Sequence, residues 1–307
     1  MTPNFGRDRL RPTLSVIRAV TYTVPDLRAI EQAYVSELGY IVAARAHVER
    51  AEACAWGAPA MEGWPALLLA PPSGEAMYLR FIQDADAAGW MALATFGWNA
   101  TEFVVQDVEA LARRLAGGAF QIIGLPRPLT RFPMIRAMQA LGPAGECCYF
   151  TEVGPGSGLE LAAARAFVGR VFIVVSGGSD VDALLAAYSV FDNLVDPPVA
   201  TPVTVISRAH GLPVDTVHRH ALVRLSEGTM IELDEYPPSA RTRVRVDGKL
   251  PPGMAMVTFS VDSLGPHSQG ERAFIGPPAA SRLPGIAGKC GCLYGAAGEL
   301  IELVEPD

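Results

Sequence analysis

Two stretches of the chain, residues 228–233 (GTMIEL) and 298–303 (GELIEL), share the pattern Gly-x-x-Ile-Glu-Leu. A glycine followed by alternating apolar residues is typical of a hairpin turn that leads into a half-buried strand. Gly74 and Gly145 begin comparable stretches earlier in the chain, and Gly74 lies 154 residues before Gly228. The pattern therefore predicts a unit that recurs along the chain and closes each time with the same hairpin.

The same offset relates the two halves of the sequence. Residues 26–30 (DLRAI) align with 180–184 (DVDAL), and residues 55–59 (AWGAP) align with 209–213 (AHGLP). A repeat of this length is too long for one turn of a solenoid, so it indicates a duplicated domain. We expect an N-terminal domain at 1–153, a Gly-rich linker at 154–168 and a C-terminal domain at 169–307.

Each half contains two smaller units. In the first unit a strand at 20–24 is followed by a helix whose apolar residues, from Leu27 to Leu38, recur at helical spacing and end at Gly39. A second strand at 102–105 precedes a helix at 107–116, and strands follow both helices. The chain is thus expected to hold four βαβββ modules. In the fourth, residues 263–266 (SLGP) cannot continue a regular helix, so a loop at 266–280 is expected.

Composition excludes several classes of function. The net charge is −7, and the sequence has no run of Lys or Arg, which argues against a nucleic-acid partner. No apolar stretch reaches the roughly 18 residues that a membrane span needs. Five cysteines are an odd count without the spacing of a secreted disulfide scaffold. We therefore expect a cytoplasmic protein with reduced thiols that does not bind membranes.

The strand, the VPDL sequence at 24–27 and the closing Gly-x-x-Ile-Glu-Leu resemble the vicinal oxygen chelate superfamily, which includes glyoxalase I, bleomycin-resistance proteins and extradiol dioxygenases. This resemblance implies an α+β fold of two tandem domains. Each domain would pair two βαβββ modules into a curved, incomplete mixed β-barrel, a cup that holds a metal and a small ligand. Four modules most resemble the dioxygenase layout, whose C-terminal pair carries the active site.

The resemblance also gives positions for metal ligands. Those in the opening strands, usually histidine, fall on Ala19, Ala100, Ala255 and either Arg170 or Val171. Those in the closing strands, four residues after the hairpin glycine, fall on the set Tyr78, Tyr149, Glu232 and Glu302. No opening-strand position offers an imidazole, so the usual iron site of two histidines and one carboxylate is not expected. A divalent metal held by Glu232 and Glu302 is the remaining possibility for a cofactor, which the sequence leaves unknown.

Hairpin register suggests what else lines the C-terminal cup. A three-residue turn places Leu222 opposite Glu232, so that strand alternation puts His218 and His220 on the face of Glu232. The same register places Cys292 opposite Glu302 and Cys290 on the same face. We expect Glu232 and Glu302 to face one shared cavity. The corresponding residues of the N-terminal half are Trp64, Ala66, Ala137, Gln139, Tyr78 and Tyr149.

Two functions remain open, with a slight preference for an enzyme. In the first, a lyase, isomerase or ring-processing enzyme acts on a small aromatic or oxygen-rich molecule, with Glu232 and Glu302 as bases or metal ligands and His218 or His220 as proton carrier. In the second, a non-catalytic binding or resistance protein holds a planar molecule. The ligand-binding residues are expected to be Trp64, Tyr78, Tyr149 and Cys292. Oligomeric state stays open, a homodimer included.

Overall fold

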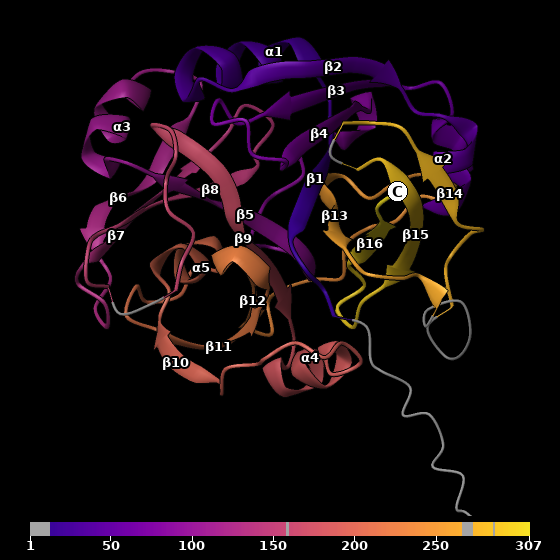
Figure 1. Cartoon of the computed structure of the whole chain (residues 1–307). Coiled ribbons are helices and arrows are strands. Elements are labelled where there is room, and N and C mark those ends of the chain that lie inside the picture. Colours follow the sequence, from indigo (N-terminus) through magenta and orange to yellow (C-terminus); the bar gives the residue numbers. More distant parts are fainter. Residues whose placement is uncertain (1–12, 158–159, 266–272, 285) are drawn as a thin grey trace, which may run out of the picture.

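The structure is a computed structural model that describes residues 13–157, 160–265, 273–284 and 286–307. Its sixteen described strands form two curved eight-stranded sheets, each wrapping around its own inner face (Figure 1). Four βαβββ modules build these sheets. The predicted α+β fold of four modules in curved mixed sheets is therefore confirmed.

Module one opens with a strand whose neighbouring helix is capped by Asp26, whose side chain accepts hydrogen bonds from the amides of Arg28 and Ala29. A π-helical turn follows this helix and ends at Gly39. The elements of module one are β1 (Ile17–Val24), α1 (Leu27–Ala33), η1 (Tyr34–Leu38), β2 (Ile41–His47), α2 (Arg50–Ala55), η2 (Pro59–Met61), β3 (Pro65–Ala70) and β4 (Tyr78–Gln83). The short η3 (Ala85–Ala87) leads to module two.

Asp107 and Asp180 cap the helices of modules two and three as Asp26 does in module one. Module two contains β5 (Gly97–Val105), α3 (Val108–Leu115), β6 (Gln121–Pro128), β7 (Ile135–Leu141) and β8 (Cys147–Val153). Module three contains β9 (Val168–Gly178), α4 (Val181–Tyr188), β10 (Val199–Pro202), α5 (Thr204–Ala209), β11 (Val217–Arg224), η4 (Ser226–Gly228) and β12 (Met230–Glu235).

Module four departs from the others in the way that its sequence predicts. Residues 261–265 and 273–278, the described parts of the connection between its first two strands, contain no α-helix. The middle of the expected loop, residues 266–272, lies outside the described residues. The strands are β13 (Gly253–Ser260), β14 (Ala279–Ser281), β15 (Gly288–Tyr294) and β16 (Leu300–Glu305).

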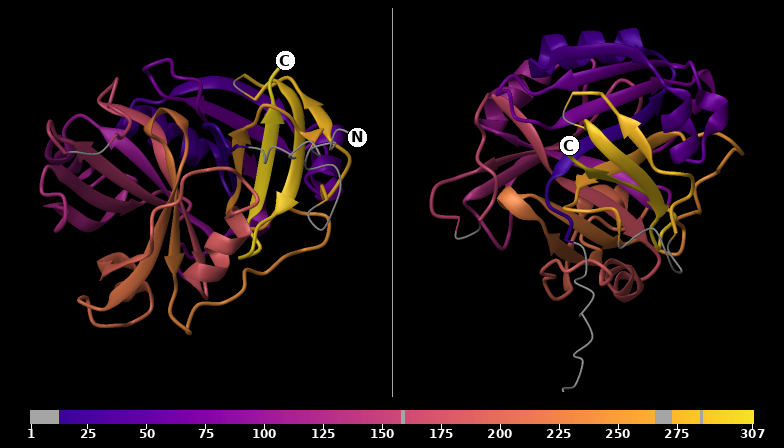
Figure 2. Two further views of the ribbon diagram at one scale, coloured as in Figure 1. Left: turned by 60° about the horizontal axis from the view of Figure 1, so that its bottom comes forward. Right: turned by 45° about the vertical axis from the view of Figure 1, so that its right-hand side comes forward.

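The sheets do not follow the two halves of the sequence. One sheet, the 1–4 sheet, has the order β14-β15-β16-β13-β1-β4-β3-β2 and joins module one to module four. The other, the 2–3 sheet, has the order β10-β11-β12-β9-β5-β8-β7-β6 and joins module two to module three. The antiparallel pairs β1–β13 and β5–β9 make these joins. Each curved sheet therefore takes one module from each half of the chain (Figure 2).

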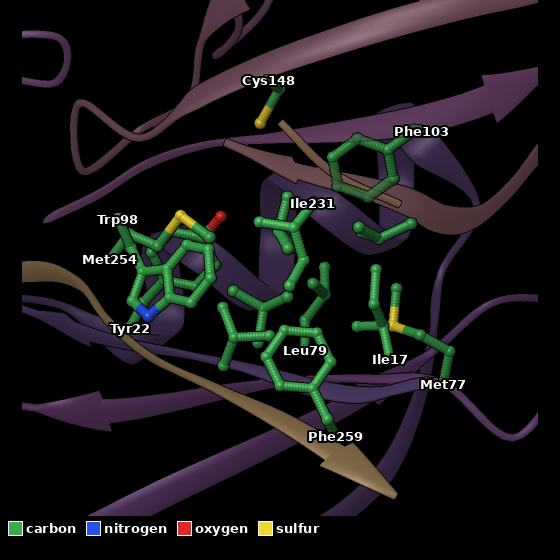
Figure 3. Packing of buried hydrophobic residues seen from close by; sticks show 14 of the residues in the cluster. Ile17, Tyr22, Met77, Leu79, Trp98, Phe103, Cys148, Ile231, Met254 and Phe259 are labelled. Carbon is green, nitrogen blue, oxygen red and sulfur yellow. The ribbon is translucent and has the colours of Figure 1, made fainter. Parts of the chain in front are cut away.

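One large hydrophobic core lies on the outer faces of both sheets. The aromatic residues Tyr22, Phe81, Phe103 and Phe259 and the helices α1, α3 and α4 contribute to it (Figure 3). Trp98 donates a hydrogen bond from Nε1 to the carbonyl of Leu300, 2.7 Å away in the other sheet. Each inner face carries a separate, smaller apolar cluster. No helix of the described residues is long and apolar enough to cross a membrane.

Two equivalent hydrogen bonds tie α1 and α4 to the hairpins of the following modules. The hydroxyl of Tyr34 donates to Oε1 of Glu146 at 3.0 Å, and the hydroxyl of Tyr188 donates to Oε1 of Glu299 at 3.1 Å. Each glutamate follows a hairpin glycine, Gly145 or Gly298, whose φ near 80° is the left-handed conformation expected from the sequence. The sequence repeat thus preserves a contact between modules as well as a local motif.

We expect Tyr34→Phe to lower the free energy of unfolding by about 1–2 kcal/mol, because a buried carboxyl loses its phenol donor. Urea denaturation would measure the loss. The matched control is Tyr294→Phe, which alters a phenol on an exposed side chain and should change stability little. Equal effects from both variants would contradict a stabilising role for the Tyr34–Glu146 bond.

Candidate functional site

The inner face of the 1–4 sheet is closed by a buried ion pair. The Nη2 atom of Arg80, on β4, lies 2.8 Å from Oε2 of Glu302, on β16, and both side chains are almost fully buried. Trp56, just after α2, donates from its indole nitrogen to Oε1 of Glu302 at 2.6 Å. The guanidinium of Arg80 also lies over the Trp56 ring, 4.6 Å from its centroid. These contacts join residues from opposite ends of the chain.

Two threonines complete this network. Thr21 on β1 accepts a hydrogen bond from Nε of Arg80 at 2.8 Å, and Thr258 on β13 donates to Oε2 of Glu302 at 2.5 Å. Strand pairing sets both contacts, since Thr21 is level with Arg80 and Thr258 with Glu302. A buried ion pair is stable only when further hydrogen bonds offset the loss of hydration. The threonines and Trp56 supply those bonds.

The inner face of the 2–3 sheet has a different composition. Five residues, here called the acid–phenol cluster, gather there from three strands and the residue after β12: Glu102, Tyr149, Glu232, Asp234 and Tyr236. Glu102 on β5 is level with Tyr149 on β8, and β12 carries both Glu232 and Asp234 on this face. Apolar residues surround the cluster, among them Ala100, Val175 and Ile206.

No basic side chain neutralises these acids. None of the ion pairs among the described residues includes Glu102, Glu232 or Asp234. Burial raises the pKa of Glu102 to about 8, an effect that the charge of Glu232 increases. Burial and the neighbouring Glu232 also hold the pKa of Asp234 well above its usual range. Glu102 is therefore a carboxylic acid rather than a carboxylate at neutral pH, and the protonated form of Asp234 is favoured, whereas Glu232 is half-buried and reaches solvent.

Several polar atoms of the cluster lack a partner. The hydroxyl oxygens of Tyr149 and Tyr236 and the Oδ1 atom of Asp234 are buried and make no hydrogen bond. These three residues are at most 9 % exposed. Burial raises the pKa of both phenols, so they remain neutral. Unpaired buried polar groups are costly, and they are common where a ligand supplies the missing partners.

Tyr236 owes its place to a glycine. A Cβ atom built on Gly177 of β9 would lie 2.5 Å from the Tyr236 ring, so the ring can pack against the strand only because no side chain is there. The backbone amide of Tyr236 donates to the carbonyl of Gly178 at 2.7 Å. The pair Gly177-Gly178 thus lets Tyr236 cover the end of the inner face and bring its hydroxyl to the acids.

The two strand-borne histidines lie beside this cluster. His220 is level with Asp234 on the adjacent strand, and its Nδ1 atom is buried without a hydrogen bond. His218 is buried, and its Nε2 atom lies 2.9 Å from Oγ of Ser207 on α5. Burial, aided by the nearby His210, lowers the pKa of His218. His220 is therefore available to a ligand, whereas His218 is engaged with Ser207.

Comparisons with known proteins show which solved structures share this fold. Neither a protein-family model nor a curated protein sequence matches the chain. Among solved structures, glyoxalase I from Zea mays is 14 % identical, with a TM-score of 0.62 over 94 % of this chain and 92 % of that one. A "putative dioxygenase" from Bacillus subtilis is 13 % identical, with a TM-score of 0.65 over 95 % of this chain and 85 % of that one. The chain has the fold of the vicinal oxygen chelate superfamily.

The superfamily implies a metal, and neither inner face fits one. In the 1–4 sheet the guanidinium of Arg80 already supplies the positive charge beside Glu302. In the 2–3 sheet the opening strand offers Ala100 and Glu102 but no imidazole. Across the described parts of the chain, no three His, Cys, Asp or Glu side chains converge as metal ligands. Glu232 and Glu302 lie in different sheets and therefore do not form a shared metal site.

The hairpin registers predicted from the sequence are confirmed, but the prediction that Glu232 and Glu302 share one cavity is wrong. Leu222 is level with Glu232 and Cys292 with Glu302, as the hairpins predict. However, β12 and β16 belong to different sheets, so Glu232 and Glu302 do not share a cavity. His218, His220 and Glu232 instead face module two, where Tyr149 lies, while Cys290 and Cys292 lie with Glu302 opposite module one.

The other expected ligand-binding residues lie with the ion pair. Trp64 packs against the apolar cluster of the 1–4 sheet, with Nζ of Lys249 5.0 Å from its ring centroid. Tyr78 begins β4, two residues before Arg80, and does not reach Glu302. Cys292 is fully buried beside Met256. Of the expected ligand-binding residues, only Tyr149 belongs to the acid–phenol cluster.

Sequence reasoning missed Arg80, Glu102, Asp234 and Tyr236. A signal for two of them was present, because Asp234 lies 154 residues after Arg80, the offset of the repeat. Glu102 likewise lies five residues before the helix-capping Asp107, as Thr21 does before Asp26. At these positions the 1–4 sheet carries a base and a hydroxyl, Arg80 and Thr21, where the 2–3 sheet carries two acids, Asp234 and Glu102.

The Arg80–Glu302 pair can be tested by a double-mutant cycle. We expect Arg80→Met or Glu302→Leu alone to reduce the free energy of unfolding by about 3–5 kcal/mol, because each leaves a buried charge without its partner. The double variant should lose less than the sum of the two single variants. Urea denaturation measures all three, and additive losses would show that the two charges do not interact.

The raised pKa of Glu102 predicts how the stability of the protein changes with pH. Its pKa in the folded protein, about 8, exceeds the usual value of 4.5, so the folded state binds more protons than the unfolded state between these values. Stability should therefore fall as pH rises from 5 to 9, by a few kcal/mol at most, since each pKa unit corresponds to about 1.4 kcal/mol. Glu102→Gln should flatten this decline in urea midpoints measured across the range.

Glu146 provides the matched comparison, because burial raises its pKa to about 7. The fall in stability that is due to Glu146 should be complete at a lower pH than the fall due to Glu102. Glu146→Gln should remove this lower-pH fall. An unchanged pH profile in Glu102→Gln would show that this carboxyl is ionised in the folded protein.

Proposed function

We propose that the acid–phenol cluster of the 2–3 sheet binds a small organic molecule and performs acid–base chemistry on it. The observation that carries this proposal is the gathering of Glu102, Glu232 and Asp234 with two phenols, without a basic partner and with three buried polar atoms left unpaired. A structural cluster would satisfy those atoms within the protein, as the Arg80–Glu302 network largely does.

The acids are suited to different roles. Glu232 is half-buried and accessible, so it is the group best placed to accept a proton from a bound molecule. Glu102, with a pKa of about 8, keeps its proton at neutral pH and can act as an acid. His220, adjacent to Asp234, can carry the proton onward. A pair of carboxyl groups in different surroundings, one buried and one accessible, is a common basis of acid–base catalysis.

The hydroxyls of Tyr149 and Tyr236 would orient the molecule. Both phenols are neutral and unpaired, so each can donate to an oxygen of the ligand or accept from a donor. Apolar residues such as Val175 and Ile206 line the same face and suit an aromatic or aliphatic body. A small aromatic or oxygen-rich substrate for a lyase, isomerase or ring-processing reaction fits this lining.

A binding protein without catalytic activity is the second candidate. The observation that favours it is the alanine at position 100, where the superfamily resemblance places a metal-binding histidine. In either case we propose that the protein works in the cytoplasm, because all five of its cysteines are free thiols.

The test is a screen of small aromatic and oxygen-rich compounds by ligand-observed NMR, with turnover of each hit followed in the same samples. We expect Glu232→Gln to lower turnover by about 10²-fold or more and Tyr149→Phe to weaken binding. Asp215→Asn, a charge change at an exposed residue of the same module, is the matched control and should behave as the wild type. Hits that bind equally to all variants would contradict the proposed site, and binding without turnover would favour the second candidate.

A further inference from the structure

The charge of the acid–phenol cluster indicates what it binds. Glu102, Glu232 and Asp234 bring three carboxyl groups to one inner face, and no ion pair of the described residues includes any of them. The guanidinium of Arg243 acts on Tyr236, but its nitrogens are engaged with the carbonyls of Met254 and Trp98. A cationic group that enters the cluster is therefore favoured over a neutral or an anionic one.

The unpaired atoms suit a group that donates several hydrogen bonds. The Oδ1 atom of Asp234 is an acceptor, and the phenol oxygens of Tyr149 and Tyr236 can also accept. Glu232, half-buried and level with Leu222, supplies a fourth acceptor at the solvent side. A primary ammonium group has three N–H donors, as many as the three unpaired buried atoms, and one positive charge that suits the accessible Glu232.

The surroundings of the cluster suit an organic cation better than a bare metal ion. No three His, Cys, Asp or Glu side chains of the described residues converge as metal ligands, even though three acids share the face. Neutral phenols are poor metal ligands, and the residues packed around the cluster, among them Val175, Ile206 and Ala100, are apolar. Apolar surroundings suit a carbon skeleton attached to the charged nitrogen.

We propose that the acid–phenol cluster recognises an organic amine, a primary ammonium group on an aromatic or aliphatic body. The ammonium donates to Oδ1 of Asp234 and to the phenol oxygens of Tyr149 and Tyr236, with Glu232 beside it, while the body packs toward Val175 and Ile206. This inference rests on the proposed function and names the substrate class of that site.

The raised pKa values of two acids explain how the fold tolerates the cluster. Glu102 holds its proton at neutral pH and burial favours the protonated form of Asp234, which reduces the repulsion among the three acids. A bound ammonium lowers the pKa of each nearby acid, so binding should release protons. The titratable groups beside Asp234 are Glu102, Glu232, Tyr149, Tyr236 and His220, and Cys147 lies beside the two phenols. Amine affinity should accordingly increase from pH 6 to pH 8.

The experiment compares three probes of similar shape: benzylamine, benzyl alcohol and benzoate. Isothermal titration at pH 7.5 should show binding of benzylamine, weaker binding of benzyl alcohol and none of benzoate. Glu232→Gln should weaken benzylamine binding by about tenfold or more, because a favourable charge interaction is lost, and should weaken benzyl alcohol binding much less. Asp215→Asn is the charge-matched control and should bind benzylamine as the wild type does. Titrations in two buffers of different ionisation enthalpy should show proton release.

Four outcomes would overturn the inference: benzyl alcohol or benzoate binding as tightly as benzylamine, benzylamine binding unaffected by Glu232→Gln, no benzylamine binding up to millimolar concentration, or displacement of benzylamine by stoichiometric Zn²⁺ or Mn²⁺. The proposed function would survive any of these if screening hits still depended on Tyr149 and Glu232. Loss of that dependence as well would reject the site itself.

Discussion

The buried pair of Arg80 and Glu302 is the constraint on which the arrangement of this chain depends. Its two members are 222 residues apart, and they meet because β1 and β13 are adjacent in one sheet. A charge buried without its partner is strongly unfavourable, so neither module one nor module four can bury its charged inner face alone. The pair therefore favours one pairing of modules, in which the first closes against the last and the two central modules form the second sheet.

The duplicated halves make two kinds of contact between modules, one within each half of the chain and one between the halves. Within each half, a tyrosine at the end of the first helical segment, Tyr34 or Tyr188, donates to a hairpin glutamate of the next module, Glu146 or Glu299. Between the halves, antiparallel first strands join the modules into sheets. The contacts within a half are repeated almost unchanged, whereas the inner faces formed between halves have diverged.

The two inner faces differ in how their charges are satisfied. In the 1–4 sheet, the guanidinium of Arg80, the indole of Trp56 and the hydroxyl of Thr258 surround one carboxylate, and a second hydroxyl, that of Thr21, bonds the guanidinium. In the 2–3 sheet, burial favours the protonated forms of Glu102 and Asp234, Glu232 reaches solvent and two phenols lack partners. A single fold has thus been used once for stability and once, on our proposal, for the recognition of an amine. The physical difference is the presence or absence of a basic side chain inside the sheet.

The sequence by itself determined the local structure of this protein. Helix caps at Asp26, Asp107 and Asp180, the hairpin glycines and the alternation of strands predicted four modules, the α+β class and the register that sets Leu222 against Glu232. These features depend on residues close together in the chain. Which modules share a sheet was decided only by tertiary structure, because all four opening strands are largely buried and rich in apolar residues, so each could pair with any other. Packing across more than 200 residues selects among them, and with that choice it separated Glu232 from Glu302 and placed Glu102 beside Glu232.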